Sequence, residues 1–378
     1  MKLFGTDGIR GRAGAPPLDP RTINRVGAAL VRALPANDAA SPRVLVGRDT
    51  RESGEWIERE LARGLACGGA TMVSAGVIPT PAIAYLTRSE SFDAGIVISA
   101  SHNPYEDNGI KVFSGRGEKL PEALEEHIGA MVADESFTVT PGPSALPGPS
   151  APQARDLSTR YVAHLRKILP SAGSLAGSTI VVDCANGATG TIAPALFADL
   201  GFKVVLIGNE PNGRNINLNC GSTHLGAVRA KVKETGARLG VAFDGDGDRA
   251  LFVDADSAIV DGDAVMLIAA DQLKAEGRLT GNAVVATVMS NIGLEIALRD
   301  RCIALVRAPV GDKYVMEEMV KRGSALGGEQ SGHIIFADHL FTGDGIATAL
   351  NVLRIMVATS PLSDWASAWR VSDLLGRS

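Results

Sequence analysis

A threefold repetition of short apolar runs, each followed by a polar loop, restricts the fold more than any other feature. The first runs of the three copies begin at residues 44, 180 and 284, and an amphipathic stretch follows each of them. A second run comes after that stretch, and a third run ends at a further polar loop. Short buried strands that alternate with amphipathic helices are typical of α/β proteins. We therefore predict three tandem α/β modules with mixed, mostly parallel sheets around a central cleft.

The expected strands can be assigned copy by copy. They are residues 44–46, 71–74 and 95–98, then 180–182, 203–207 and 239–243, then 284–288, 303–306 and 325–326. Ser53 is expected to N-cap the helix after the first strand. Because loops at the carboxyl ends of parallel strands bind ligands, the three final loops are the candidate functional segments.

A proline-rich segment indicates a domain boundary. Residues 141–152 contain five prolines, which cannot donate hydrogen bonds to a sheet and which favour an extended chain. We predict domains at residues 1–152, 153–256 and 257–378.

Composition excludes several classes of protein. The 378 residues carry a net charge of −5, so there is no basic excess for nucleic acid or an anionic membrane. No apolar run approaches the roughly 18 residues of a membrane span, and no signal-peptide core follows the N-terminus. The 4 cysteines are scattered, which favours a reducing compartment. We expect a cytoplasmic protein.

The first candidate loop contains a hydroxyl beside an imidazole. Ser101 precedes His102 in residues 99–104, and Lys111 follows along the chain. A nucleophilic hydroxyl needs a nearby base or metal, so this is a possible nucleophile site. A polar turn in which serine and asparagine bond to the backbone explains the segment equally well. The G-x-S-x-G nucleophile elbow is absent.

The second candidate loop follows an apolar strand and contains Asp244, Asp246 and Asp248. Three carboxylates at alternate positions can converge on one hard cation, whereas without a cation they repel one another. A solvated acidic loop is the alternative. An EF-hand is excluded, because Arg249 and Ala255 stand where it needs glycine and glutamate.

Two further segments bear polar groups suited to a sugar phosphate. Glu329, Ser331 and His333 lie in a glycine-rich loop that could bind sugar hydroxyls, although a plain turn is equally possible. Arg10 lies in another glycine-rich run and could make a two-pronged contact with phosphate, or be a solvated surface residue. Combined with Ser101, these groups suggest metal-assisted phosphoryl transfer.

Seven segments in this order resemble the α-D-phosphohexomutase superfamily, and within it the bacterial phosphoglucosamine mutases. They are residues 4–11, 99–111, 244–249, 287–291, 310–315, 328–333 and 342–345. The resemblance covers the chain from residue 1 to about residue 366. It implies that glucosamine 6-phosphate and glucosamine 1-phosphate are interconverted through a phosphoserine and bound glucosamine 1,6-bisphosphate. The product would feed UDP-N-acetylglucosamine and peptidoglycan precursor synthesis.

The resemblance also implies a role for each matching residue. Ser101 would carry the phosphoryl group, and its phosphate would join the three aspartates in holding one Mg²⁺. The residues around the phosphoryl group would be Arg10, His102, Lys111 and Arg249, with Lys111 as a general acid/base. The sugar would contact Glu329, Ser331 and His333. The implied partners are a phosphosugar substrate and a second copy of the chain bound through the first domain, with no nucleic acid or membrane.

The chain departs from the family pattern at two places. Lys313 stands where arginine is expected. The family also has a fourth domain, whose Arg-Ser-Gly-Thr-Glu-Pro-like loop grips the distal phosphate of the substrate, and no such loop occurs before Ser378. The segment 369–378 matches nothing expected. We expect a missing fourth domain and impaired activity.

Three alternatives remain open from the sequence. The strand before Asp244 resembles the start of an aspartyl-nucleophile phosphatase, in which Asp244 would be the nucleophile, although Asp248 stands where that pattern wants threonine or valine. The preferred sugar could instead be that of a phosphomannomutase or phosphoglucomutase. The chain could also be a truncated, non-catalytic protein that binds phosphosugar and metal.

Overall fold

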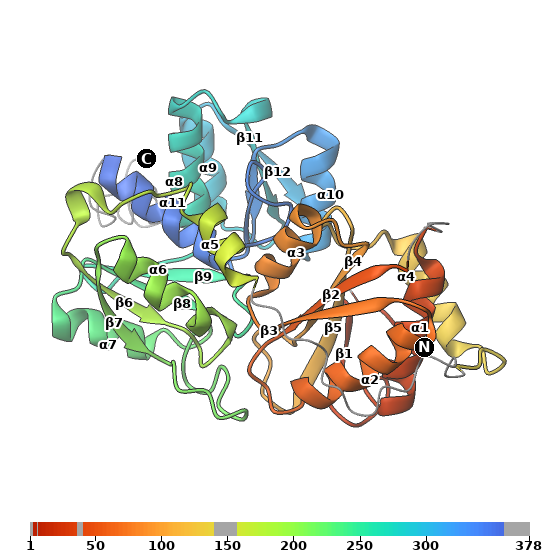
Figure 1. Ribbon diagram of the computed structural model, residues 1–378. Helices are drawn as coiled ribbons and strands as arrows, with labels where there is room; N and C mark the ends of the chain where they lie inside the picture. Colours follow the sequence, from red (N-terminus) through yellow and green to blue (C-terminus); the bar gives the residue numbers. More distant parts are fainter. Residues whose placement is uncertain (1–2, 6, 36–40, 140–156, 359–378) are drawn as a thin grey trace. The chain divides into compact units, whose positions relative to one another are not determined.

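Three β-sheets organise the computed structural model, which describes residues 3–5, 7–35, 41–139 and 157–358 (Figure 1). The chain divides into two units. The N-terminal unit contains Met1–Tyr161 and Pro211–Ile216, and the C-terminal unit contains Val162–Glu210 and Asn217–Ser378. The predicted linker at 141–152 and the end at 369–378 lie outside the described residues.

The N-terminal unit holds one five-stranded sheet with the order β1-β5-β4-β2-β3. Its elements are β1 (Ile9–Arg12), α1 (Pro20–Ala33), β2 (Arg43–Arg48), α2 (Gly54–Cys67), β3 (Thr71–Val77), α3 (Thr80–Ser89), β4 (Ala94–Ile98), β5 (Asp107–Ser114) and α4 (Glu122–Ala133). Val44 and Val46 pack in the core formed with α1 and α2. Gly47 faces α3, where a Cβ atom would lie 2.7 Å from the Ile83 side chain. Alternation along β2 thus directs successive residues toward different helices.

The C-terminal unit holds two sheets, with the orders β10-β9-β8-β6-β7 and β12-β11-β13-β14. Elements of the first are β6 (Thr179–Asp183), α6 (Ala193–Asp199), β7 (Lys203–Ile207), α7 (Gly226–Thr235), β8 (Leu239–Phe243), β9 (Ala250–Asp254) and β10 (Ile259–Val260). Elements of the second are α8 (Gly262–Ala275), β11 (Ala283–Thr287), α9 (Ile292–Asp300), β12 (Ala304–Ala308), α10 (Asp312–Arg322), β13 (Leu326–Gly328), β14 (Ile334–Phe336) and α11 (Gly345–Ala358). The helix α5 (Ser158–Leu165) contains the division between the units, and short 3₁₀ turns cover Gly173–Leu175, Ala188–Thr191 and Thr280–Asn282.

The three sheets repeat one arrangement, as the sequence predicts. In each, the first strand of the copy (β2, β6 or β11) lies between the second and third strands and runs parallel to both. An antiparallel strand then pairs with the third strand. The predicted α/β modules with mixed sheets are therefore confirmed. The three domain boundaries stay predictions.

The predicted capping of helix α2 by the Ser53 side chain is wrong. Helix α2 follows Ser53, but this residue has φ −73° and ψ −17° and makes no side-chain cap. A capping side chain needs an extended backbone at its own position, so that its oxygen can reach the first free amides. The Ser53 hydroxyl instead accepts a hydrogen bond from Asn108 Nδ2 at 2.8 Å. Asp19 and Asp261, which are extended, cap α1 and α8.

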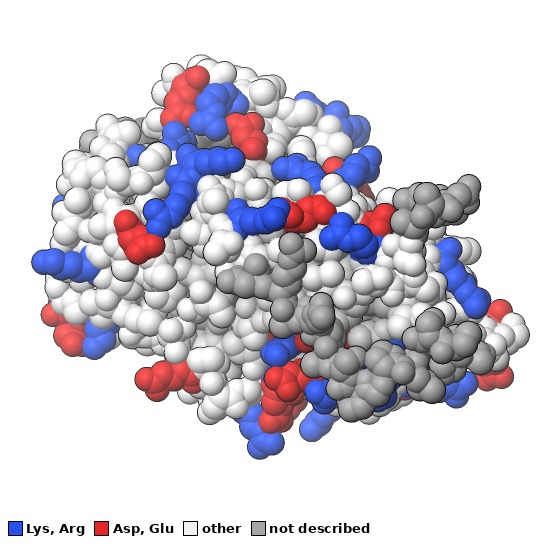
Figure 2. Space-filling view, in the orientation of Figure 1, with Lys and Arg blue, Asp and Glu red and all other residues white. Residues whose placement is uncertain are grey.

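Surface charge is mixed on the face shown in Figure 2, where acidic and basic side chains are interspersed. Among the described helices, none combines the length and the apolarity that crossing a membrane requires. The expected absence of a nucleic-acid partner stays a prediction.

Candidate active site

The loop between β4 and β5, residues 99–106, carries Ser101 and is called the serine loop here. Ser101 has φ +53°, in the left-handed region that side chains other than glycine seldom adopt. Its Oγ lies 3.2 Å from His102 Nδ1, and its amide donates to Ser99 Oγ at 2.9 Å. Sparsely populated backbone conformations cluster at functional sites, where the surrounding structure imposes them.

Arg10 lies against the serine loop. Its Nη1 donates to the Ala100 carbonyl at 3.2 Å and lies 3.5 Å from Asn103 Oδ1. Arg10 on β1 pairs with Gly109 on β5, so its side chain shares a face of the sheet with Lys111, two residues further along β5. The structure therefore brings two of the predicted cations to one face beside this loop.

Asp7 joins these cations and was not identified as a site residue from the sequence. Its carboxylate forms an ion pair with Arg10 and lies 3.1 Å from Lys111 Nζ and 2.5 Å from Lys119 Nζ. The nearby Arg10 was a signal for Asp7 in the sequence. Nothing local indicated Lys119, because the contact depends on how the chain folds back. The Asp7 carboxylate thus offsets part of the positive charge that gathers beside the serine loop.

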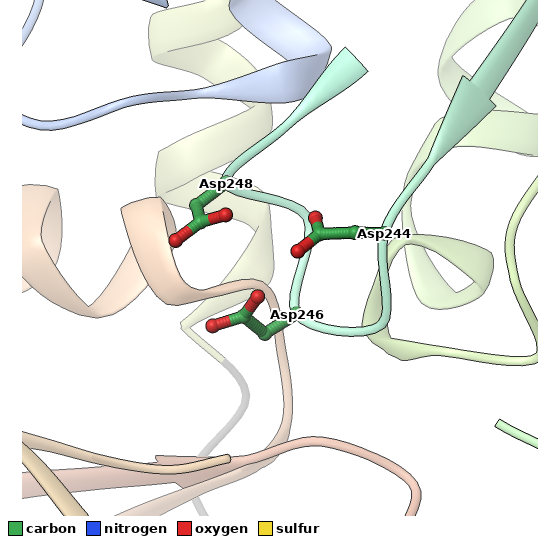
Figure 3. Close-up of side chains that lie close together, drawn as sticks. All are labelled: Asp244, Asp246 and Asp248. Atoms are coloured by element: carbon green, nitrogen blue, oxygen red, sulfur yellow. The ribbon is translucent and has the colours of Figure 1, made fainter. Parts of the chain in front are cut away.

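The loop between β8 and β9, residues 244–249, forms a carboxylate cluster and is called the aspartate loop. One oxygen from each of Asp244, Asp246 and Asp248 lies within 4.8 Å of the others (Figure 3). Gly247, with φ +74°, permits the tight turn, and the Arg249 amide donates to Asp244 Oδ1 at 3.1 Å. Three converging carboxylate oxygens fit a hard divalent cation. This arrangement can bind a metal ion.

The side chain of Arg249 carries positive charge beside this cluster. Burial disfavours the charged guanidinium, but the carboxylates of Asp248 and Asp244 outweigh it and raise the pKa of Arg249. Arg249 therefore offsets part of the repulsion among the aspartates.

The loop between β13 and β14, residues 329–333, is called the glutamate loop. Glu329 Oε1 accepts from the Gly311 amide at 3.2 Å. The Ser331 hydroxyl has no hydrogen-bond partner within the part of the chain that the structure describes. The Gly332 carbonyl accepts from the Ala250 amide at 3.1 Å. Because Ala250 directly follows the aspartate loop, this bond ties the two loops together.

His333 also connects these loops. The residue is 2% exposed, and its Nε2 accepts from the Gly343 amide at 3.0 Å. Its Nδ1 lies 3.7 Å from Asp248 Oδ2. Burial lowers the pKa of His333, but the nearby carboxylates of Asp248 and Asp312 outweigh burial and raise it. The structure places His333 against a carboxylate of the metal cluster, and its predicted contact with sugar stays a prediction.

The predicted site residues thus form two groups, one in each unit. The N-terminal unit holds Arg10, Ser101, His102 and Lys111. The C-terminal unit holds Asp244, Asp246, Asp248, Arg249, Glu329, Ser331 and His333.

Comparison with known families identifies the family to which the chain belongs. Models of the phosphoglucomutase/phosphomannomutase α/β/α domains I, II and III match residues 1–139, 159–257 and 261–371. The chain belongs to this family. It is therefore an isomerase of the α-D-phosphohexomutase superfamily, an intramolecular phosphotransferase.

Individual relatives of this phosphohexomutase are similar along most of its length. It is 52% identical over 353 residues to phosphoglucosamine mutase from Solibacter usitatus, covering 93% of this chain and 78% of that one. It is 47% identical over 367 residues to phosphoglucosamine mutase from Sorangium cellulosum, covering 97% and 76%. A crystal structure of a phosphoglucomutase/phosphomannomutase family protein from Burkholderia thailandensis superposes with TM-score 0.81 and 28% identity, over 98% of this chain and 80% of that one. The aspartyl-nucleophile phosphatase alternative is not favoured by these matches, and the predicted absence of a fourth domain stays a prediction.

Proposed function

We propose that this phosphohexomutase is a phosphoglucosamine mutase that interconverts glucosamine 6-phosphate and glucosamine 1-phosphate, with Ser101 as its phosphoryl carrier. The relatives at 47–52% identity that bear this name support the substrate. One structural observation supports the chemistry: Ser101, held at positive φ, lies on a loop that Arg10 contacts. Arg10 and Lys111 share one face of the sheet beside this loop. The proposed intermediate is glucosamine 1,6-bisphosphate.

In the proposed transfer from Ser101 to the sugar, a sugar hydroxyl oxygen forms a bond to phosphorus and releases its proton to water, while the bond from phosphorus to Ser101 Oγ breaks. The ammonium group of Lys111, which lies 3.1 Å from the Asp7 carboxylate, donates a proton to the departing Oγ. Arg10 and His102 lie at the serine loop, where they can stabilise the charge on the phosphoryl oxygens. The reverse transfer returns the proton to Lys111.

We propose that the carboxylates of Asp244, Asp246 and Asp248 hold one Mg²⁺, with the Ser101 phosphate as a further ligand. Bound Mg²⁺ would supply positive charge that neutralises the transferring phosphoryl group. Arg249 orders the aspartate loop through its amide and adds a fixed cation to it.

The proposed sugar contacts come from the glutamate loop. Ser331 offers a hydroxyl without a partner among the described residues, which suits a hydrogen bond to a sugar hydroxyl. Glu329 offers a carboxylate that the Gly311 amide already orients. His333 would act through Asp248 and through contact with the sugar. Homodimerisation through the first domain remains part of the proposal.

The direct test is a mutase assay on the full chain with Mg²⁺ and a catalytic amount of glucosamine 1,6-bisphosphate. Phosphorus NMR distinguishes the 6-phosphate from the 1-phosphate without coupling enzymes. We expect kcat/KM to be highest for glucosamine 6-phosphate, lower for glucose 6-phosphate and mannose 6-phosphate, and lost in Ser101→Ala. A preference for glucose or mannose would contradict the proposed substrate, and the absence of turnover with all three would contradict the proposed activity.

A further inference from the structure

We propose that Arg51 and Ser99, joined through Asp49, are positioning residues that hold the serine loop in its left-handed conformation and so set the place of Ser101 Oγ for phosphoryl transfer. This inference rests on the proposed role of Ser101. Neither residue needs to touch substrate, because both act through the backbone of the serine loop.

The guanidinium of Arg51 donates hydrogen bonds to several backbone carbonyl groups in and next to this loop. Its Nη2 donates to the Ser101 carbonyl at 3.0 Å and to the Asn103 carbonyl at 2.8 Å. Its Nη1 donates to the Asp107 carbonyl at 3.0 Å and also to the Pro104 carbonyl. One fully buried side chain therefore fixes four carbonyl groups within seven consecutive residues.

Asp49 and Ser99 connect this guanidinium to the amide of Ser101. Asp49 Oδ2 accepts from Arg51 Nε at 2.9 Å and from the Ser99 hydroxyl at 2.6 Å. The same Ser99 oxygen accepts from the Ser101 amide at 2.9 Å. Ser101 is thus held at both its amide and its carbonyl by one network that starts at a buried ion pair.

Such a network suits a loop that must keep an unfavourable conformation. Carbonyl dipoles that converge on one point repel one another unless a cation lies between them, and a positive φ at serine is seldom populated. Charge-assisted hydrogen bonds in a buried setting are strong and directional. Because a displacement of about 1 Å at a reacting atom can lower a rate about 100-fold, the network matters for kcat.

A purely structural role is the alternative to be excluded. In that case the ion pair would only stabilise the fold, and loss of the network would lower the unfolding temperature without changing kcat per folded molecule. Ser74 provides the matched control. It lies on β3 in the same unit, is 4% exposed, and donates its hydroxyl to Glu58 away from the serine loop.

The experiment compares Ser99→Ala, Arg51→Lys and Ser74→Ala in the full chain. Three quantities are measured for each: the unfolding temperature, amide hydrogen exchange in peptides covering residues 99–107, and kcat and KM with glucosamine 6-phosphate. We expect Ser99→Ala and Arg51→Lys to speed exchange in these peptides about tenfold or more. We expect kcat to fall about 10- to 100-fold with KM changed less than about threefold. Lysine keeps the charge but lacks the fork that reaches several carbonyls.

Ser74→Ala should lower the unfolding temperature with wild-type kcat and wild-type exchange at 99–107. If Arg51→Lys does not fold, the kcat and the amide exchange of Ser99→Ala alone test the inference. Wild-type kcat in folded Ser99→Ala, or unchanged exchange in both variants, overturns the inference. If the wild-type chain has no mutase turnover, the proposed function fails on that result, and the exchange comparison alone then shows whether the network holds the loop.

Discussion

The serine loop and the aspartate loop occupy the same place in two copies of the module but differ in the charged side chains that gather at them. Each joins the third parallel strand of its sheet to the antiparallel strand that follows, from β4 to β5 and from β8 to β9. Arg10 lies against the first loop, whereas three carboxylates converge in the second. The repeated fold therefore determines where a functional loop lies, and the residue types determine what it can bind.

The two loops are also held differently. Arg51 and Asp49, from the segment after β2, brace the serine loop through buried side-chain hydrogen bonds. The aspartate loop is held instead by backbone hydrogen bonds. The Gly247 amide donates to the Asp244 carbonyl at 3.2 Å, and the amides of Ala188 and Gly345 donate to the carbonyls of Gly245 and Gly247 at 2.8 and 2.9 Å. A bound metal ion would neutralise the carboxylates of the aspartate loop. The serine loop needs no metal ion for this purpose, because the Arg51 guanidinium already holds its carbonyl groups. The two loops should therefore respond to different perturbations.

The largest effect is expected from loss of a carboxylate in the aspartate loop. Asp246→Ala should lower Mg²⁺ affinity at least about 100-fold, since even partners outside the ligand shell typically contribute 10- to 100-fold. Turnover should fall about 1000-fold. The unfolding temperature in metal-free buffer should rise, because two carboxylates repel less than three. Calorimetric titration and thermal unfolding with and without Mg²⁺ measure these changes.

The control for that variant is Asp256→Asn, an exposed carboxylate beyond β9. It should leave both metal affinity and turnover unchanged. If Asp246→Ala binds Mg²⁺ as the wild type does, the aspartate loop is not the metal site, and the contrast between the two loops disappears.

A smaller effect is expected from removing a cation near the serine loop. Lys111→Met should lower kcat about 100-fold by removing the proton donor, while Mg²⁺ affinity stays at the wild-type value. Arg116→Gln is the control, because Arg116 lies just beyond β5 with a side chain that is 79% exposed. A shared loss of metal affinity and kcat in Lys111→Met would show that the two loops do not have separate roles.

The smallest effect is expected in the glutamate loop. Ser331→Ala should raise the KM for glucosamine 6-phosphate about fivefold, the equivalent of one hydrogen bond of about 1 kcal/mol, with little change in kcat. Ser324→Ala is a matched control. Its hydroxyl also lacks a partner among the described residues, but it precedes β13 and lies outside the loop. An unchanged KM in Ser331→Ala would remove this hydroxyl from the sugar site.

The sequence predicted the modules and the three loops because these depend on local patterns. Apolar runs of strand length mark β2, β6 and β11, and alternating aspartates in one turn already bring their carboxylates together. The Ser53 cap failed because a distant amide, that of Asn108, takes its hydroxyl.

Long-range contacts account for what the sequence could not predict. Lys119 meets Asp7 across more than one hundred residues, and Arg51 reaches the serine loop across about fifty. The periodicity and spacing of residues in the sequence cannot predict such contacts, because the contacts form only once β2, β4 and β5 are side by side in the sheet. For the same reason, the link between His333 and Asp248 emerges only from the folded C-terminal unit.

The site of phosphorylation tests the central claim most directly. The purified chain is incubated with glucosamine 1,6-bisphosphate and Mg²⁺, and its intact mass and phosphopeptides are measured beside those of Ser101→Ala. The account predicts that the wild type gains one phosphoryl group, that it maps to Ser101, and that the variant gains none. Phosphate that maps to Asp244 or to any other residue, or that Ser101→Ala still acquires, would contradict the account.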